Sequence, residues 1–204
     1  MTDERTPGLV LQSPGGTRFH FDPGALCLEL LPTGGPGRHS RYEILHQPSD
    51  LLKWLEESRL ALPPGTVRIS DDQLTAVRAL RDTLWRLTAA RASGTRAPDE
   101  PADHALLNRT AARPPLAPQI APDGTSAPPL PGDGDQLAST LARDAIALFT
   151  GPHAHRIREC GADNCQLLFV DTSRPGRRRW CSMERCGNRH KVRALRARRE
   201  RPEE

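Results

Sequence analysis

The spacing of apolar residues predicts that the first 150 residues of this chain are mainly helical. The longest regular pattern begins after Ser70 and Gln73, whose spacing is that of a capping box at a helix start. Apolar residues then recur every three or four positions, which places them on one face of the helix. These residues are Leu74, Val77, Leu80, Leu84 and Leu87. We expect this face to lie in the protein core.

Three further helices follow from similar patterns. Ser49 is expected to be the N-cap of a helix that buries Leu51, Leu52 and Leu55. A second helix is expected over residues 100–112. A third ends at Gly151, a residue that commonly terminates helices. Its apolar positions are Leu137, Leu141, Ala145 and Leu148.

Two short strands are expected before the first helix. Residues 17–21 alternate between polar and apolar side chains, so Phe19 and Phe21 share one face. The apolar run over residues 25–31 is predicted to be the second strand. By contrast, residues 114–135 contain seven Pro and three Gly, which favours either a linker or an irregular hairpin that covers the helices.

These patterns predict an α+β protein with two parts. Residues 17–150 form a mainly helical α/β domain with a short β-sheet, and residues 151–204 form a small C-terminal module. The charge differs between the first 150 residues and the rest of the chain. Residues 1–150 carry 15 basic and 18 acidic side chains, whereas residues 151–204 carry 14 basic and 7 acidic ones. A basic module is typical of contact with an acidic partner, of which nucleic acid is the first to consider.

Four of the five cysteines lie in the basic module, as the pairs Cys160-x4-Cys165 and Cys181-x4-Cys186. Two such pairs on separate turns can converge on one tetrahedral Zn²⁺. Two disulfides are the alternative. However, the chain begins without an apolar signal segment and contains no run near the ~20 apolar residues of a membrane helix. We therefore expect a cytoplasmic protein without membrane contact, in which clustered thiols stay reduced and usually bind metal. Cys27 lies in an apolar run and is expected to be a small core residue.

The segments around the cysteines predict a strand, a turn, a second strand and a helix. Residues 166–170 and 177–180 are expected to pair as a hairpin, and Ser182 is expected to cap a helix over residues 183–199. This order is similar to that of a treble-clef finger. The module has too few apolar side chains to be stable alone, so we expect it to unfold without its metal.

Arginines on this helix and hairpin are candidate contacts for nucleic acid. At about 100° per residue, one helix face carries Arg185, Arg189, Arg196 and Arg199, with Arg193 at its margin. A second face, with Cys186 and His190, is expected to lie toward the zinc. Val192 and Leu195 interrupt the basic face, which indicates that it also packs on the N-terminal domain or a second subunit. The candidate contacts are Arg177, Arg178, Arg179, Arg185, Asn188, Arg189, Arg193, Arg196 and Arg199. Asn188 either pairs with a base or orders the zinc loop.

Cys186-Gly187-Asn188-Arg189, together with residues 168–174 and 178–183, resembles the CGNR zinc-finger family over residues 156–199. The resemblance implies that one structural zinc is bound by the four paired cysteines, which are Cys160, Cys165, Cys181 and Cys186. The preceding region resembles the ABATE domain that usually accompanies this finger, described as a bacterial stress-induced transcription regulator. This chain has Glu29 where that family tends to have Asp, and Pro32-Thr33 where it tends to have Asn-Thr.

Charge and resemblance together predict a zinc-dependent transcription regulator that binds double-stranded DNA. Its N-terminal domain is expected to sense a signal or to form a homodimer. The alternative is a zinc module that binds RNA or another protein without recognising a DNA sequence. An enzyme is not expected, because four cysteine ligands leave the zinc no open position for water.

Overall fold

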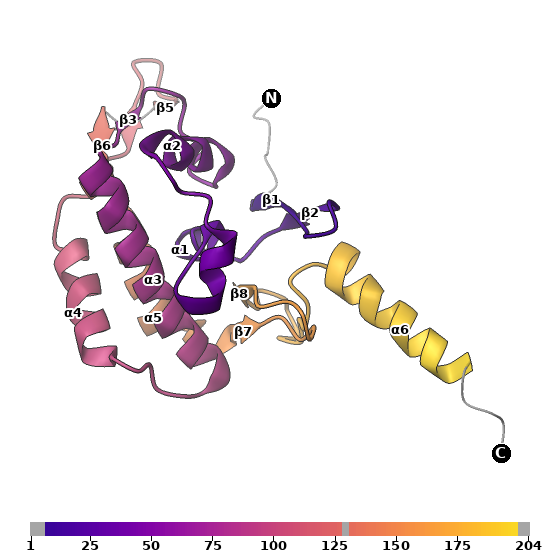
Figure 1. The fold of residues 1–204 in the computed structure, drawn as a ribbon. Helices are drawn as coiled ribbons and strands as arrows, with labels where there is room; N and C mark the ends of the chain where they lie inside the picture. The colour runs from indigo at the N-terminus through magenta and orange to yellow at the C-terminus, as the bar shows by residue number, and fades with distance from the viewer. Residues whose placement is uncertain (1–6, 128–130, 200–204) are drawn as a thin grey trace.

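The computed structural model describes residues 7–127 and 131–199. Its centre is the long helix α3 (Asp71–Ser93), against which α4 (Glu100–Ala111) and α5 (Gly134–Thr150) pack, as Figure 1 shows. Two smaller helices complete this body: α2 (Pro48–Glu57) packs on α3, and the single turn α1 (Leu26–Glu29) packs on α5. The buried side chains of these helices form one hydrophobic core.

The start of α3 confirms the predicted capping box. The backbone N–H of Gln73 donates to the Ser70 hydroxyl at 3.2 Å, and the Ser70 N–H donates to the Gln73 side chain at 3.1 Å. The helix ends at Gly94, whose φ of 68° lies in the left-handed region that glycine adopts without strain. All five residues of the predicted apolar face are buried. The predicted helices over residues 100–112 and up to Gly151 are confirmed as α4 and α5.

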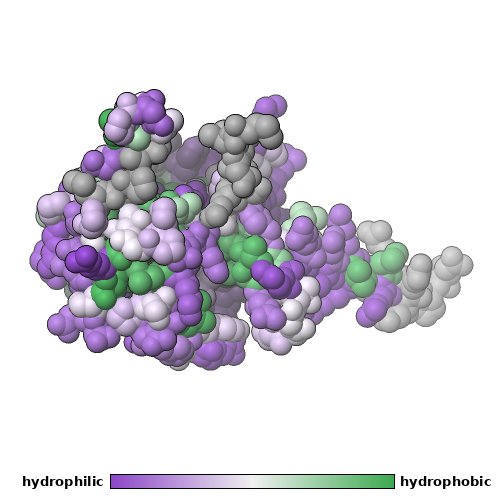
Figure 2. Space-filling view, turned by 90° about the horizontal axis from the view of Figure 1, so that it is seen from above, coloured by the Kyte–Doolittle hydropathy of each residue, from purple (hydrophilic) through white to green (hydrophobic). Residues whose placement is uncertain are grey.

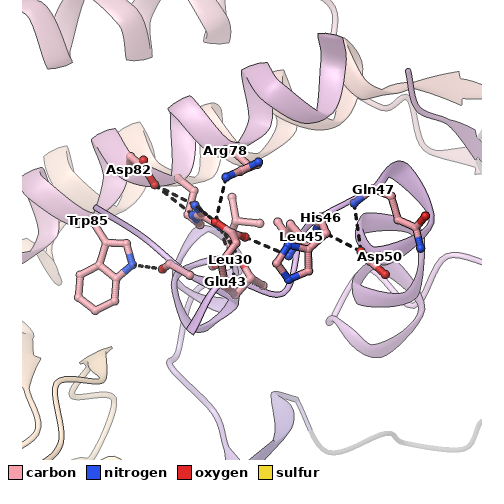
Figure 3. A network of polar contacts seen from close by, with 12 residues as sticks. Leu30, Glu43, Leu45, His46, Gln47, Asp50, Arg78, Asp82 and Trp85 are labelled. Atoms are coloured by element: carbon pink, nitrogen blue, oxygen red, sulfur yellow. Dashed lines mark hydrogen bonds and ion pairs between the residues drawn. The ribbon is translucent and has the colours of Figure 1, made fainter. Parts of the chain in front are cut away.

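The predicted N-cap of α2 was wrong by two residues. The helix begins at Pro48, and the residue before it, Gln47, is the N-cap, so that Ser49 lies inside the first turn. Proline is well suited to the first helical position, because its missing N–H would have had no partner there. The side chain of Asp50 accepts hydrogen bonds from the backbone N–H groups of His46 and Gln47, both at 3.1 Å (Figure 3).

The predicted strand over residues 25–31 was also wrong. This segment forms α1 and a 3₁₀ turn, η1 (Leu31–Thr33). A continuous apolar run fits a buried helix as well as a buried strand, and here almost every side chain of the run is buried. Its polar backbone groups find partners on other helices, since the Cys27 N–H donates to Asp144 of α5 and the Trp54 indole of α2 donates to the carbonyl of Glu29.

The described strands form four separate two-stranded sheets, so the predicted α+β class is confirmed. β1 (Leu9–Gln12) and β2 (Arg18–Phe21) make an antiparallel hairpin that includes the predicted strand. β3 (Val67–Arg68) pairs in parallel with β6 (Gly132–Asp133). β4 (Gln119–Ile120) and β5 (Ser126–Ala127) form the irregular hairpin that was one of two alternatives for the Pro-rich segment.

The fourth sheet joins the C-terminal module to the helices. It pairs β7 (Ile157–Glu159), which follows the 3₁₀ turn η3 (Ala154–Arg156), with β8 (Leu168–Val170). Ile157, Leu168 and Val170 are buried in the same core as α3 and α5. The predicted partner of β8, residues 177–180, forms no ladder with it: β8 pairs with β7, and the carbonyl of Arg179 accepts a hydrogen bond from the Gly161 N–H at 2.9 Å. That prediction of a hairpin was therefore wrong in its pairing.

A buried ion pair fixes the loop between α1 and α2, which contains the 3₁₀ turn η2 (Gly37–Tyr42). Arg81 of α3 is 1% exposed and donates to both carboxylate oxygens of Glu43, at 2.8 and 2.7 Å. Figure 3 shows Arg78 and Asp82 beside this pair and the Trp85 indole donating to the same loop. Burial raises the pKa of Glu43, but hydrogen bonds from Arg81 and the Leu45 N–H outweigh it and hold the pKa below its ordinary value.

The last described element is a helix that stands apart from the body. A π-helical turn, η4 (Met183–Gly187), leads directly into α6 (Asn188–Arg199). The predicted helix over residues 183–199 is thus confirmed in extent. α6 projects away from the other elements in Figure 1, and Figure 2 shows the same from a perpendicular direction. None of the helices that the structure describes is both long enough and apolar enough to cross a membrane.

Candidate metal centre

The sulfur atoms of Cys160, Cys165, Cys181 and Cys186 all lie within 4.8 Å of one another, and all four residues are buried. The Sγ atoms of Cys165 and Cys181 are 3.6 Å apart, and those of Cys181 and Cys186 are 3.5 Å apart. Four sulfurs at about 2.3 Å from a tetrahedral Zn²⁺ are separated by about 3.8 Å, so these distances are close to those of a loaded site. The five cysteines of the chain are free thiols, which argues against the disulfide alternative.

Local backbone hydrogen bonds place each sulfur. Cys160 directly follows β7, and its N–H donates to the carbonyl of Leu167 at 2.9 Å. Cys165 ends a tight turn, in which its N–H donates to the carbonyl of Ala162 at 2.9 Å. The N–H of Cys181 donates to the sulfur of Cys160 at 3.3 Å, which links the two cysteine pairs. Cys186 lies in η4, as expected for a ligand in the first turn of the helix.

The thiols form one coupled acid–base cluster. Hydrogen bonds donated by Cys165 and Cys181 lower the pKa of Cys160 to about 2, and donating to Cys160 raises the pKa of Cys165 to about 12. The bond to Cys160 also raises the pKa of Cys181, and burial raises that of Cys186. The cluster therefore favours one thiolate, while ionising all four at this separation requires a bound cation.

The donor set fits zinc. It consists of four soft sulfur ligands without a carboxylate, and Zn²⁺ prefers such ligands in tetrahedral structural sites. The four cysteines form a zinc-binding cluster consistent with one structural zinc. When bound, the metal supplies the positive charge that keeps the thiols deprotonated and holds η4 against the turn at Cys165.

The loop between the two cysteine pairs is ordered by Asp171. Its carboxylate accepts hydrogen bonds from the Ser173 hydroxyl at 2.6 Å and from the N–H groups of Ser173 and Arg178, at 3.0 and 2.9 Å. Although burial raises the pKa of Asp171, these bonds hold it below its ordinary value. This geometry confirms the turn predicted over residues 171–176.

Arg178 differs from the two arginines beside it. Its guanidinium donates to the carbonyls of Cys181 at 2.6 Å, Asp22 at 3.0 Å and Trp180 at 3.1 Å, and it lies over the ring of Phe169 at 4.2 Å. The sequence did not distinguish this structural role, because three consecutive arginines carry the same signal. The side chains of Arg177 and Arg179 are exposed.

Arg185 is likewise separated from the other arginines of the helix. It is half-buried, with its guanidinium 4.7 Å from the centre of the Phe19 ring. The π-helical turn explains the difference, because a wider turn rotates residues before Gly187 relative to those after it. Arg189, Arg193 and Arg196 are exposed on α6, whereas the side chain of Arg199 lies outside the described residues.

Other residues of α6 are exposed as well. The side chain of Asn188 is exposed and makes no hydrogen bond with any residue that the structure describes, whereas its backbone N–H donates to the carbonyl of Arg185. His190, expected to lie toward the zinc, is exposed but packs beside the Trp180 ring at 4.8 Å between ring centres. Val192 and Leu195 are 48% and 51% exposed, so no described part of the N-terminal domain covers them.

Three residues of the N-terminal region are buried and make contacts within the helical body. Cys27 is fully buried, which confirms the prediction of a core residue. Glu29 is also fully buried and accepts hydrogen bonds from the Nε and the backbone N–H of Arg59, each at 2.9 Å. Burial raises the pKa of Glu29 despite these bonds. The Thr33 hydroxyl donates to the carbonyl of Leu30 at 2.6 Å.

Comparison with protein families gives two matches along the chain. The ABATE family, described as "Putative stress-induced transcription regulator", matches residues 24–152. The CGNR zinc finger matches residues 156–199 and so includes all four clustered cysteines. A search of curated proteins gave no match.

Proposed function

The chain belongs to the ABATE family and carries a CGNR zinc finger, and on this basis we propose that it is a zinc-dependent transcription regulator that binds double-stranded DNA through α6. The zinc has a structural role in this proposal, since four thiolates leave no coordination position for a substrate or water. The protein therefore acts by binding and not as an enzyme.

The proposal rests mainly on the exposure of α6. Every residue of α6 whose side chain is described is exposed, and the helix contains six basic residues and no acidic one. A helix with so little packing gains nothing from the hydrophobic core, and its positive charges repel one another. Phosphates of a nucleic acid would neutralise these charges. The 12 residues of α6 span about 18 Å, enough to lie across a major groove about 12 Å wide.

Arginines of the neighbouring loop extend the basic surface. Arg177 and Arg179 line an open groove of about 710 Å³ beside η4, together with His20 and Met183. Neither arginine has an ion-pair partner among the residues that the structure describes. We assign phosphate contacts to Arg177, Arg179, Arg189, Arg193 and Arg196. Arg178 and Arg185 contribute by holding the finger in shape.

A second candidate function is binding of another protein through the same helix. Val192 and Leu195 lie one turn apart on α6 and are about half exposed, which is the arrangement of a helix that docks on an apolar groove or on its copy in a homodimer. RNA is a third candidate partner, because its phosphates would bind the same arginines. The experiment must therefore separate a phosphate contact from an apolar one.

Charge-matched double variants test the proposal. Arg193→Ala/Arg196→Ala should weaken binding of zinc-loaded protein to duplex DNA and reduce the salt slope by about two, one for each lost phosphate contact. Arg68→Ala/Arg109→Ala removes the same charge from exposed positions on the helical body and should leave binding unchanged. If both variants bind DNA as the wild type does, α6 is not the contact surface. Preference for RNA in the same assay would replace DNA as the partner.

A further inference from the structure

The β1–β2 hairpin lies outside both regions that match known families, yet its buried face belongs to the metal centre. Phe19 is 4% exposed and Phe21 is fully buried, and both are packed in one cluster with the four cysteines and Phe169. We propose that this hairpin (Leu9–Phe21) is a structural part of the zinc finger. Phe19 and Phe21 are positioning residues that close the cysteine cluster to water and slow the release of its metal.

The strand pairing explains why these two rings reach the cysteines together. In the antiparallel register Phe19 lies opposite Leu11 and Phe21 lies opposite Leu9, so all four side chains share one face of the hairpin. Leu11 also packs against the cysteine cluster. On the other face Val10 is 52% exposed. The hairpin thus has one apolar face, which packs in the cysteine cluster through Phe19, Phe21 and Leu11 and in the main core through Leu9.

The hairpin is attached to the finger beside the second cysteine pair. Arg185, the residue before Cys186, stacks on Phe19, and its Nε is buried without a hydrogen-bond partner among the described residues. Its guanidinium is therefore held at the ring and not by an acceptor. On the other side, one nitrogen of Arg178 donates to both the Asp22 carbonyl, just after β2, and the Cys181 carbonyl. Movement of the hairpin would disturb both turns that present Cys181 and Cys186.

Covering the sulfurs should affect how fast the metal leaves. Zinc leaves when a proton reaches a thiolate or when water or a competing ligand reaches the metal, and apolar rings packed around the cysteines hinder that approach. Removal of groups that surround metal ligands typically costs 10- to 100-fold in metal affinity. Replacing either phenylalanine with alanine should therefore accelerate zinc release by about tenfold or more.

Phe149 provides a matched control. It is a buried phenylalanine in the main core, and it also has an arginine over its ring, Arg91 at 4.1 Å, but it lies outside the cysteine cluster. Zinc release from the full-length, zinc-loaded protein is followed by the absorbance of a chromogenic chelator. Phe19→Ala and Phe21→Ala should release zinc about tenfold faster than wild type or more. Phe149→Ala should remain close to the wild-type rate, and Phe19→Leu should release zinc at a rate between those of wild type and Phe19→Ala.

Two results would overturn the assignment. One is release at the wild-type rate from both hairpin variants, and the other is equal acceleration in Phe149→Ala, which would indicate a general loss of stability. If an alanine variant does not fold, the rate of zinc release is measured for Phe19→Leu and Phe149→Leu instead. Only Phe19→Leu should then release zinc faster than wild type. The assay contains no nucleic acid, so its outcome does not depend on the proposed DNA binding.

Discussion

Replacing Cys181 with Ser should release the zinc and open the finger only from Asp171 onward. The structure gives the reason for this boundary. Among the described residues after Val170, the buried apolar side chains are only those of Cys181 and Cys186. Ordering a residue costs about 1–2 kcal/mol in backbone entropy, which such sparse burial cannot offset over this segment. Metal binding, which contributes about 10–16 kcal/mol in small zinc fingers, must therefore stabilise it.

The preceding strands are held differently. Ile157, Leu168 and Val170 are buried against the helical body, and a fully buried aliphatic side chain contributes roughly 1.5–3 kcal/mol. We therefore expect β7 and β8 to stay folded without metal. This differs from the sequence-based expectation that the whole C-terminal module unfolds without its metal.

Amide hydrogen exchange resolved by peptide measures the boundary. In Cys181→Ser, residues 177–196 should exchange at the rate of an unfolded chain, while peptides of β7 and β8 stay protected. Cys27→Ser, which alters a buried thiol in the helical core, should keep its zinc and the protection of the finger. Persistent protection of residues 177–196 without zinc would refute the reasoning, and so would loss of protection throughout β7 and β8.

Further predictions concern the helical body and are checked by urea denaturation. Arg81→Met should destabilise the fold by about 3–5 kcal/mol, because it leaves the largely buried Glu43 carboxylate without its bidentate partner. Since the folded-state pKa of Glu43 is lowered, its contribution is complete above the ordinary carboxyl pKa of about 4.3 and is lost as the pH falls through the folded value. The stability difference between wild type and Glu43→Gln should therefore shrink on acidification below about pH 4. Ser70→Ala should cost about 1 kcal/mol through loss of the cap of α3. Gly35→Ala should cost more than about 1 kcal/mol, because its Cβ would lie 2.5 Å from the Trp85 ring at a φ of 154°.

The parts of the fold that the sequence predicted well are those with local signals. The apolar period of α3 coincides with a capping box at Ser70, so pattern and cap indicate the same helix. The cysteine spacing likewise indicated the ligands, because two short cysteine pairs on separate turns can converge on one tetrahedral metal ion. In each case, residues close together in the sequence carry the whole signal.

The errors arise where distant residues decide the structure. Residues 25–31 are apolar except for Glu29, which gives no helical or strand period, and the segment forms a helix in contact with α2 and α5. The partner of β8 was misassigned because β8 pairs with β7, where Ile157 lies opposite Val170 and both side chains enter the main core. The alternation at Phe19 and Phe21 was visible, but nothing local indicated that these rings pack in one cluster with cysteines about 140 or more residues away.

Binding of the zinc-loaded wild-type protein to random-sequence duplex DNA over a range of salt concentrations tests the central claim most directly. With three to five of the arginines Arg177, Arg179, Arg189, Arg193 and Arg196 on phosphates, the logarithm of the binding constant should fall with the logarithm of the salt concentration with a slope of about −3 to −4.5. Absence of binding at about 50 mM salt, with one zinc bound per chain, would contradict DNA binding through α6 and leave protein contact through Val192 and Leu195 as the function of this helix.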